Sequence, residues 1–210
     1  FAKLAPNVPH ARHMYGHDLR RVGRIGEAIV EFEAADRLAR AYFKQENVPP
    51  QLDWHYHHNL DLLGTSYQYR GEVKKAGATL KQSFDLPTNL VGQAVNKREW
   101  PLFLLSRGRV DESLAAAKTL IAHPHPTVQA TGHIEAGYAL LATNQYGAAG
   151  AESNAALKLL RTGAEGGNLG WLGADDCAPE FARELFGHAE VGVLPRLVHS
   201  RFGLHIVEVM

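Results

Sequence analysis

The chain of 210 residues lacks several features that would indicate a function class. It has a single cysteine, Cys177, so it can form no internal disulfide, and the redox compartment stays open. Lys plus Arg and Asp plus Glu both total 22, so no excess of positive charge attracts nucleic acid or an anionic lipid surface. No apolar run approaches the roughly 18 residues that a membrane span needs. We therefore expect neither nucleic acid nor a membrane as a partner.

The rest of the composition is ordinary except for its histidines. A hydrophobic share of 45% and a charged share of 21% are typical of a soluble globular protein with one large domain or two small ones. Because the sequence begins with Phe1 rather than Met, a processed or truncated N-terminus is consistent with it. The compartment therefore stays undecided, with the cytoplasm slightly favoured. The unusual count is twelve histidines.

A pattern recurs four times in the first three quarters of the chain. Each copy has a small or special residue, an apolar residue three later, and a turn residue four further on. An apolar residue follows two after the turn, and a small residue comes three after that. The copies begin at Gly16, Gly64, Pro101 and Gly137, and their turn residues are Gly23, Gly71, Gly108 and Asn144.

This pattern predicts four helical hairpins. Gly and Asn tolerate the left-handed backbone that ends a helix, and small residues let two helices approach closely. Apolar residues spaced three and four apart form the buried stripe of each helix. The first interval between turns is the longest, which predicts an insertion near Pro49 and Pro50, where a helix must stop. In the third copy, Pro101 replaces the small residue and is expected to kink its helix.

The pattern over residues 9–161 resembles the tetratricopeptide repeat, a helical hairpin unit of about 34 residues. "APNVPHARHMYGHDLRRVGR" with "YHHNLDLLG" also looks like a group of bacterial proteins of that family. The resemblance implies a mostly α fold over residues 1–161, stacked into an array with a concave groove for a peptide or partner helix. The groove would be lined by the first helix of each repeat: His10, His13, His17 and Arg20, then His58, Asp61, Thr65 and Gln68, then Arg98 and Leu102, then Ile134 and Tyr138.

The histidines in that register allow two interpretations. His10, His13 and His17 share one helix face, and the last two have the i, i+4 spacing at which two imidazoles can share a metal. His58 could approach from the neighbouring helix, with Asp61 as a partner behind it. The alternative is a hydrogen-bonded polar cluster or a peptide-binding surface. Since there is no HExxH motif and no cysteine nearby, we favour this alternative and assign no metal.

After Arg161 the helical periodicity ends. The stretch "GGNLGWLG", residues 166–173, leads into a strand-like piece and has no Lys, Ser or Thr at its end, so it is not a phosphate cradle. A linker would not expose Leu169 and Trp171 to solvent. "APEFARELF" predicts one helix, and the last residues predict two strands around a turn at Phe202–Gly203, the second running from Leu204 to Val209. Residues 162–210 are therefore expected to form a small α+β module.

This last section resembles the C-terminal half of a parvulin-type peptidyl-prolyl isomerase domain, from about residue 163. "GGNLGWLG" is similar to the family's "GG-D-LGW" signature, "APEF" with "ELF" to its helix, and "SRFGLHIVEV" to its closing hairpin. The resemblance implies that Leu169 and Phe181 line the pocket for the substrate proline, with Cys177 in place of the usual Met. It implies that His205 and Ser200 belong to the catalytic hydrogen-bond network. The chemistry needs no cofactor.

The chain departs from that family before the signature, where a tetratricopeptide-like hairpin stands in place of the family's first strand and its histidine. The module is thus expected to be incomplete, with an unpaired sheet edge that could accept a partner strand. The function indicated is a chaperone-like interaction scaffold for a protein or peptide client, with proline in the client. The alternatives are an active prolyl isomerase whose repeats recruit the client, with His205 and Ser200 catalytic, and a metal-binding helical-repeat protein.

Overall fold

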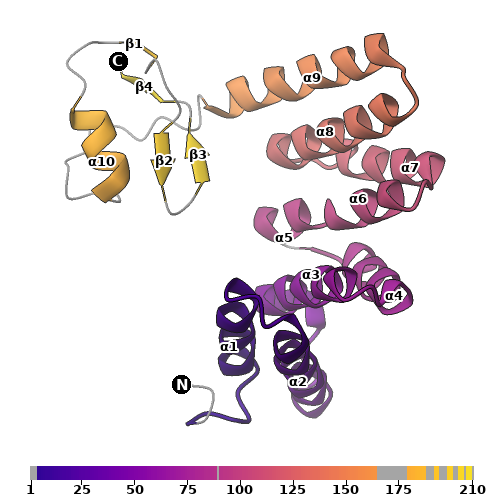
Figure 1. The fold of residues 1–210 in the computed structure, drawn as a ribbon, viewed down its shortest axis with the longest axis vertical. Helices are drawn as coiled ribbons and strands as arrows, with labels where there is room; N and C mark the ends of the chain where they lie inside the picture. The colour runs from indigo at the N-terminus through magenta and orange to yellow at the C-terminus, as the bar shows by residue number, and fades with distance from the viewer. Residues whose placement is uncertain are drawn as a thin grey trace. The chain divides into compact units, whose positions relative to one another are not determined.

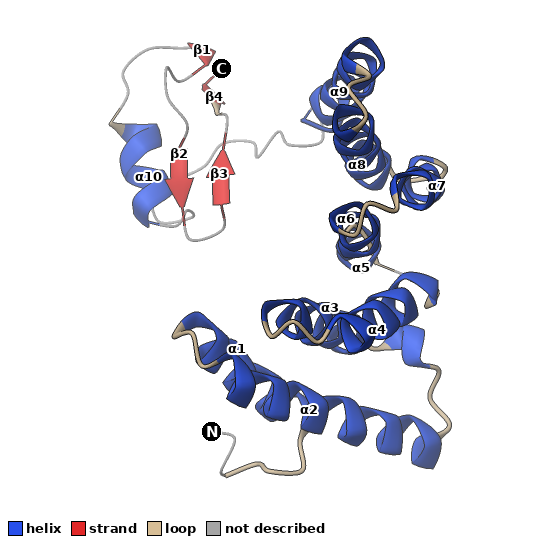
Figure 2. Cartoon of the chain, turned by 45° about the vertical axis from the view of Figure 1, so that its right-hand side comes forward, coloured by secondary structure: helices blue, strands red, loops and turns tan. Residues whose placement is uncertain are grey.

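In the computed structural model, the chain divides into two compact units, Phe1–Ala164 and Glu165–Met210. The structure describes residues 4–88, 90–164, 179–187, 192–193, 198–200, 203–205 and 207–209. Most of these residues are helical (Figures 1 and 2). Among them, no helix combines the length and the apolar character that crossing a membrane would take.

The first unit consists of helices that pack in sequence order (Figure 1). Four antiparallel pairs make contact, namely α1 with α2, α3 with α4, α6 with α7 and α8 with α9, and each pair also contacts the next. The helical hairpins expected from the repeated pattern are therefore present. The helices are α1 Pro9–Arg21, α2 Ile25–Glu46, α3 Trp54–Tyr69, α4 Val73–Asp85, α5 Val91–Asn96, α6 Glu99–Ser106, α7 Val110–Ile121, α8 Pro126–Ala142 and α9 Tyr146–Ala164, with a short 3-10 helix, η1, at Pro50–Leu52.

The four turn residues confirm the pattern at the level of backbone angles. All of them have a positive φ, between 60° at Asn144 and 79° at Gly23. The second helix of each hairpin begins at the apolar position two residues after the turn. The small residue three positions later is buried in every copy, because it lies where the two helices of the hairpin cross: Ala28, Ala76, Ser113 and Ala149.

The insertion in the first repeat is mostly additional helix. α2 has 22 residues, against 13 in α4 and 12 in α7. It ends at Glu46, with Asn47 in the left-handed conformation at φ 51°, directly before Pro49 and Pro50. The extra turns of α2 have a core of their own, in which Phe43 packs against Tyr56 and Leu60 of α3.

The first helix of the third hairpin does not have the kink that was expected at Pro101. Its first helix is divided in two, with α5 ending at Asn96 and α6 beginning at Glu99. Pro101 has no N–H to donate to the Lys97 carbonyl four residues earlier, and that carbonyl instead accepts from the Trp100 N–H, three residues on, at 3.2 Å. The i, i+4 pattern of the helix is interrupted at this point. Pro101 itself lies in the first turn of α6, where a helix needs no such donor. It is fully buried, and its carbonyl accepts a hydrogen bond from the Ser113 hydroxyl at 2.8 Å.

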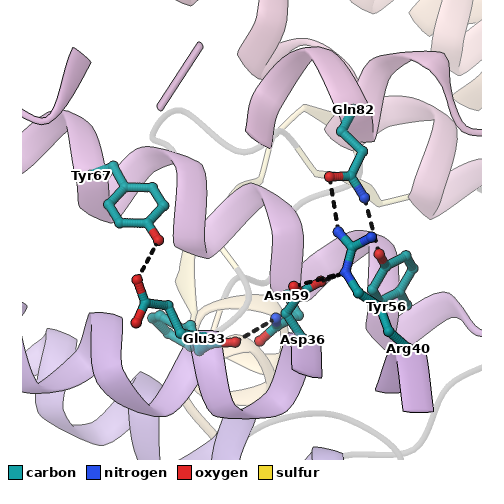
Figure 3. A network of polar contacts seen from close by, with 8 residues as sticks. Glu33, Asp36, Arg40, Tyr56, Asn59, Tyr67 and Gln82 are labelled. Atoms are coloured by element: carbon teal, nitrogen blue, oxygen red, sulfur yellow. Dashed lines mark hydrogen bonds and ion pairs between the residues drawn. The ribbon is translucent and has the colours of Figure 1, made fainter. Parts of the chain in front are cut away.

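A chain of polar contacts fixes the first hairpin to the second (Figure 3). Arg40 of α2 donates to Oε1 of Gln82 on α4 at 3.0 Å, and Nε2 of Gln82 donates to the Tyr56 hydroxyl of α3, also at 3.0 Å. Nearer the start of α2, Oε1 of Glu33 accepts from the Tyr67 hydroxyl at 2.6 Å. α2 is thus held to both helices of the second hairpin, and this fixes how α1 and α3 lie beside each other.

The second unit contains one helix and two separate pairs of short strands among its described residues. These are α10 Pro179–Phe186, β1 Gly192–Val193, β2 Val198–Ser200, β3 Gly203–His205 and β4 Glu208–Val209. β2 and β3 pair antiparallel, with Ser200 opposite Gly203 and Val198 opposite His205. β1 pairs antiparallel with β4.

This arrangement agrees with the predicted helix at "APEFARELF" and with a hairpin turning near Phe202–Gly203. The prediction of one continuous closing strand from Leu204 to Val209 is wrong. β3 ends at His205, Val207 is not in a strand, and β4 pairs with a different strand from β3. The described residues therefore form no single sheet of the kind expected for the module. The predicted strand within residues 166–173 lies outside the described residues.

Candidate functional site

A cluster of imidazoles lies between α1 and α3, where the sequence placed part of the groove. The rings of His10 and His55 lie 4.1 Å apart between their centroids, and those of His13 and His58 lie 5.1 Å apart. Trp54 covers one side of the cluster, with its ring stacked on that of His58 at 6.0 Å. His57, from the same helix, is fully buried and has no ring contact with the cluster, as its helical position predicts.

Three members of this cluster point their Nε2 atoms at a common position. Nε2 of His17 lies 3.1 Å from Nε2 of His13 and 3.2 Å from Nε2 of His58. Their ligand atoms all lie within 4.8 Å of one another, a grouping that could hold a metal ion. Burial, with the neighbouring imidazoles adding to its effect, lowers the pKa of each of the three imidazoles to about 4. They are therefore neutral at pH 7, the form in which an imidazole binds a metal.

The residue behind this trio is Asn59, which the sequence reasoning did not select. Its Oδ1 lies 3.1 Å from Nδ1 of His13, and its Nδ2 donates to the carbonyl of Phe32 at 3.0 Å. Asp61, expected in that role, instead accepts a hydrogen bond from the Ser83 hydroxyl at 2.8 Å. Asn59 follows Tyr56 by three residues and precedes Leu63 by four, so it is a polar residue on an apolar stripe. That was the available signal.

Next to the trio lies a pocket of about 510 Å³ between the first helices of the first three hairpins. It collects residues that the sequence assigned to the groove from three different repeats, together with four that it did not assign. Its lining consists of Arg20, His58, Asp61, Leu62, Thr65, Gln68, Tyr69, Asn96, Arg98 and Glu99.

The charge in this pocket is provided mainly by arginine. Arg20 donates to the Thr65 hydroxyl at 3.0 Å, and its guanidinium lies 5.3 Å from the centre of the Tyr69 ring. Burial raises the pKa of Asp61 well above its ordinary value, while the Ser83 hydroxyl, Arg98 and Lys97 oppose the rise. This rise favours the neutral carboxyl, which does not oppose Arg20, and the Glu99 carboxylate in the same pocket lies 3.5 Å from Arg98. The pocket can therefore accept an anionic or carbonyl oxygen.

The other predicted groove residues are more open. Ile134 and Tyr138 of α8 are exposed, and Leu102 of α6 is half-buried. These residues do not line the pocket. Exposed apolar side chains on a first helix are consistent with a surface for a partner, although the described contacts do not bring them together with the histidines.

The residues assigned to the parvulin-like site can be placed only in part. Leu169 and Cys177 lie outside the described residues. The backbones of Phe181, Ser200 and His205 lie in α10, β2 and β3 respectively. Ser200 and His205 occupy the same hairpin, and α10 packs against β2. That these five residues form one pocket stays a prediction.

Comparison with known families agrees with the parvulin-like resemblance predicted for the last section of the chain. The model of the PPIC-type PPIase domain matches residues 147–210. The search of curated proteins found no match. The matched range begins earlier than the predicted resemblance, at the start of α9, and so includes a helix that packs against α8 in the first unit. A parvulin-like PPIase domain is thus indicated for this range, and it overlaps the last helical hairpin.

Proposed function

We propose that the chain is a chaperone-like interaction scaffold. Its four hairpins are tetratricopeptide-like repeats whose groove binds a protein or peptide client, and its parvulin-like module, incomplete at its N-terminal side, holds proline-containing segments. The observation that supports this most is the pocket, because residues of α1, α3, α5 and α6 meet in it. PPIase domains act on proline-containing peptides, so the family match supports a client of that class.

The pocket has the features of a peptide site. Arg20 is held in place by Thr65 and Tyr69 and still lines the open space, so it can donate to a carboxylate or carbonyl of a bound chain at little entropic cost. Gln68 and Asn96 add neutral amide groups to the lining of the pocket. Such a mixture suits the polar backbone of an extended peptide better than an apolar small molecule.

The parvulin-like module is connected to the repeats through α9, and this connection supports the same function. α9 completes the last hairpin against α8, and Nδ1 of His133 lies 2.5 Å from Oε2 of Glu152 across that contact. The same helix is the first part of the range that matches the PPIase domain. In the family resembled, a separate strand and its histidine would come before such a helix. We infer that binding of proline, more than catalysis, is the property that the module retains.

Peptide binding with a variant of Arg20 tests the scaffold function. Fluorescein-labelled decapeptides centred on an X-Pro bond, with and without an acidic residue, are titrated with the full chain and followed by fluorescence anisotropy. We expect Arg20→Ala to weaken the best peptide about tenfold, because an anchored charge facing the ligand is lost. Arg24→Ala is the matched control, since Arg24 pairs with Glu27 outside the pocket. Equal weakening by both variants, or no binding of any peptide, would contradict the groove.

The alternative function is an active prolyl isomerase, and the family match favours it enough to require a test. Rotation of the X-Pro bond has a barrier of roughly 18–20 kcal/mol, so catalysis is easily measured against the slow spontaneous rate. In a protease-coupled isomerisation assay we expect the chain not to raise the rate above that background. A raised rate that disappears in His205→Ala but persists in His133→Ala would instead establish the enzyme.

A further inference from the structure

The imidazoles of His13, His17 and His58 converge between α1 and α3. Nε2 of His17 lies 3.1 Å from that of His13 and 3.2 Å from that of His58. Two nitrogen ligands at about 2.0–2.1 Å from a tetrahedral zinc ion lie roughly 3.3–3.4 Å apart. Two of the three pairs are therefore already spaced nearly as a metal would require, and all three ligand atoms lie within 4.8 Å of one another. We propose that His13, His17 and His58 bind one divalent transition-metal ion, with Zn²⁺ as the best-suited ion.

The hydrogen bonds around His13 show which of its nitrogens is available. Nδ2 of Asn59 donates to the Phe32 carbonyl, so the Asn59 oxygen must face His13. That oxygen accepts from Nδ1 of His13, and a neutral imidazole then has its lone pair on Nε2. That lone pair faces Nε2 of His17 at 3.1 Å. A ligand histidine with its second nitrogen held in this way is the usual arrangement behind a bound metal.

Hydrogen bonds among the three imidazoles alone leave their Nε2 atoms poorly paired. Nε2 of His17 is the atom close to both of the others, and at most it carries one hydrogen. That hydrogen would have to be shared between the lone pairs of His13 and His58, which weakens both contacts. A metal ion accepts all three lone pairs at once. The alternative is a hydrogen-bonded polar cluster without metal, and metal binding by the full chain distinguishes it from a metal site.

The ligand set also selects the class of ion. Mg²⁺ and Ca²⁺ require oxygen ligands, and no carboxylate belongs to the trio. Imidazole suits Zn²⁺, Co²⁺, Ni²⁺ and Cu²⁺. Three histidines on a tetrahedral ion leave the fourth position to water or another ligand, as in zinc sites that are open to substrate. All three histidines belong to the predicted groove, and His58 also lines the pocket, but metal binding can be measured without any peptide.

The test uses the full chain without a histidine tag, stripped with a chelator and dialysed. Zn²⁺ is added, unbound ion is removed by gel filtration, and the bound metal is measured by elemental analysis. Co²⁺ is added in parallel, because four-coordinate Co²⁺ has a characteristic visible absorption. We expect one ion per chain, tetrahedral Co²⁺ absorption, and a higher Tm with metal. Failure of peptide binding would not affect these results.

Single variants identify the ligands. His17→Gln and His58→Gln, at half-buried positions that can accept glutamine, are expected to lose stoichiometric metal and the Co²⁺ absorption while keeping the helical circular dichroism of the parent. Asn59→Ala, which removes the positioning residue, should weaken Zn²⁺ at least tenfold without abolishing the absorption. His133→Gln is the control histidine outside the cluster and should bind like the parent. The proposal is overturned if the parent binds no metal, or if His17→Gln and His58→Gln bind as it does.

Discussion

Replacing Gly132 with alanine is expected to lower the free energy of unfolding by about 3 kcal/mol, because α7 and α8 approach closely at this residue. A Cβ atom at Gly132 would lie 2.6 Å from the backbone nitrogen of Ile121 and 2.8 Å from the carbonyl oxygen of Ala117. Both are backbone atoms of the neighbouring helix or its last turn. They cannot rotate away as a side chain would, so the whole of α7 would have to shift.

The matched control for Gly132→Ala is the same exchange at Gly150. That glycine lies exposed in α9, and nothing lies within 4 Å of the position of its Cβ. Alanine is the better helix former, so Gly150→Ala should stabilise the chain by about 0.5–1 kcal/mol. Urea unfolding followed by far-UV circular dichroism measures both. The identical chemical change should thus have opposite signs at the two sites. Equal effects would mean that the α7–α8 contact is looser than the structure shows.

The sequence was sufficient for the hairpins because their turns depend on local chemistry. A left-handed residue at Gly23 or Asn144 is favoured by the residue itself, and the small residue at Ala28 or Ser113 is needed wherever two helices cross. These features recur at fixed spacing and are visible without any knowledge of tertiary contacts. The division of the third hairpin into α5 and α6 was less visible. It depends on Pro101, whose missing N–H leaves the Lys97 carbonyl to accept from Trp100, three residues on, in place of a donor four residues on.

The histidine cluster was predictable in part for a related reason. The spacing of His13 and His17 follows from helix geometry alone. The approach of His58 depends on the packing of α1 against α3. The register of that contact is fixed by α2, which forms hydrogen bonds with Tyr67 and Gln82, and Gln82 in turn donates to Tyr56. Asn59 takes the place expected for Asp61 behind the imidazoles, because Asp61 faces Ser83 of α4. The polar position on an apolar stripe was a signal for Asn59, but which side of α3 faces α4 is a tertiary property.

In the last section, motif resemblance was more informative than periodicity. "GGNLGWLG" and "SRFGLHIVEV" indicated the family that the comparison also finds at residues 147–210. Periodicity alone joined β3 and β4 into one strand, since the residues from Leu204 to Val209 are uniformly suited to β structure. It could not show that the chain changes partner between them, because strand pairing is a non-local property.

Glu135 should make the stability of the chain depend on pH between about 4.5 and 7. Its side chain is 4% exposed, and its Oε2 has no hydrogen-bond partner. Burial raises its pKa from 4.5 to about 7, with Glu99 adding to the rise and Arg98 opposing it. In this window the folded chain keeps a proton that the unfolded chain has lost, so stability falls as the pH rises. We expect a loss of about 2 kcal/mol, less than the full shift implies, since nearby solvent screens part of it.

Glu135→Gln removes the titrating group while keeping the shape of the side chain. The variant should match the parent near pH 4.5 and exceed its stability by about 2 kcal/mol at pH 8, where the parent must bury a carboxylate. Other groups also titrate in this range, so the informative quantity is the difference between the two urea unfolding curves at each pH. Glu112→Gln is the control, because its partner Arg109 lowers the pKa of that exposed carboxyl. Its difference from the parent should therefore stay constant above pH 5. A constant difference for Glu135→Gln as well would mean that Glu135 is ionised in the folded chain and finds a partner there.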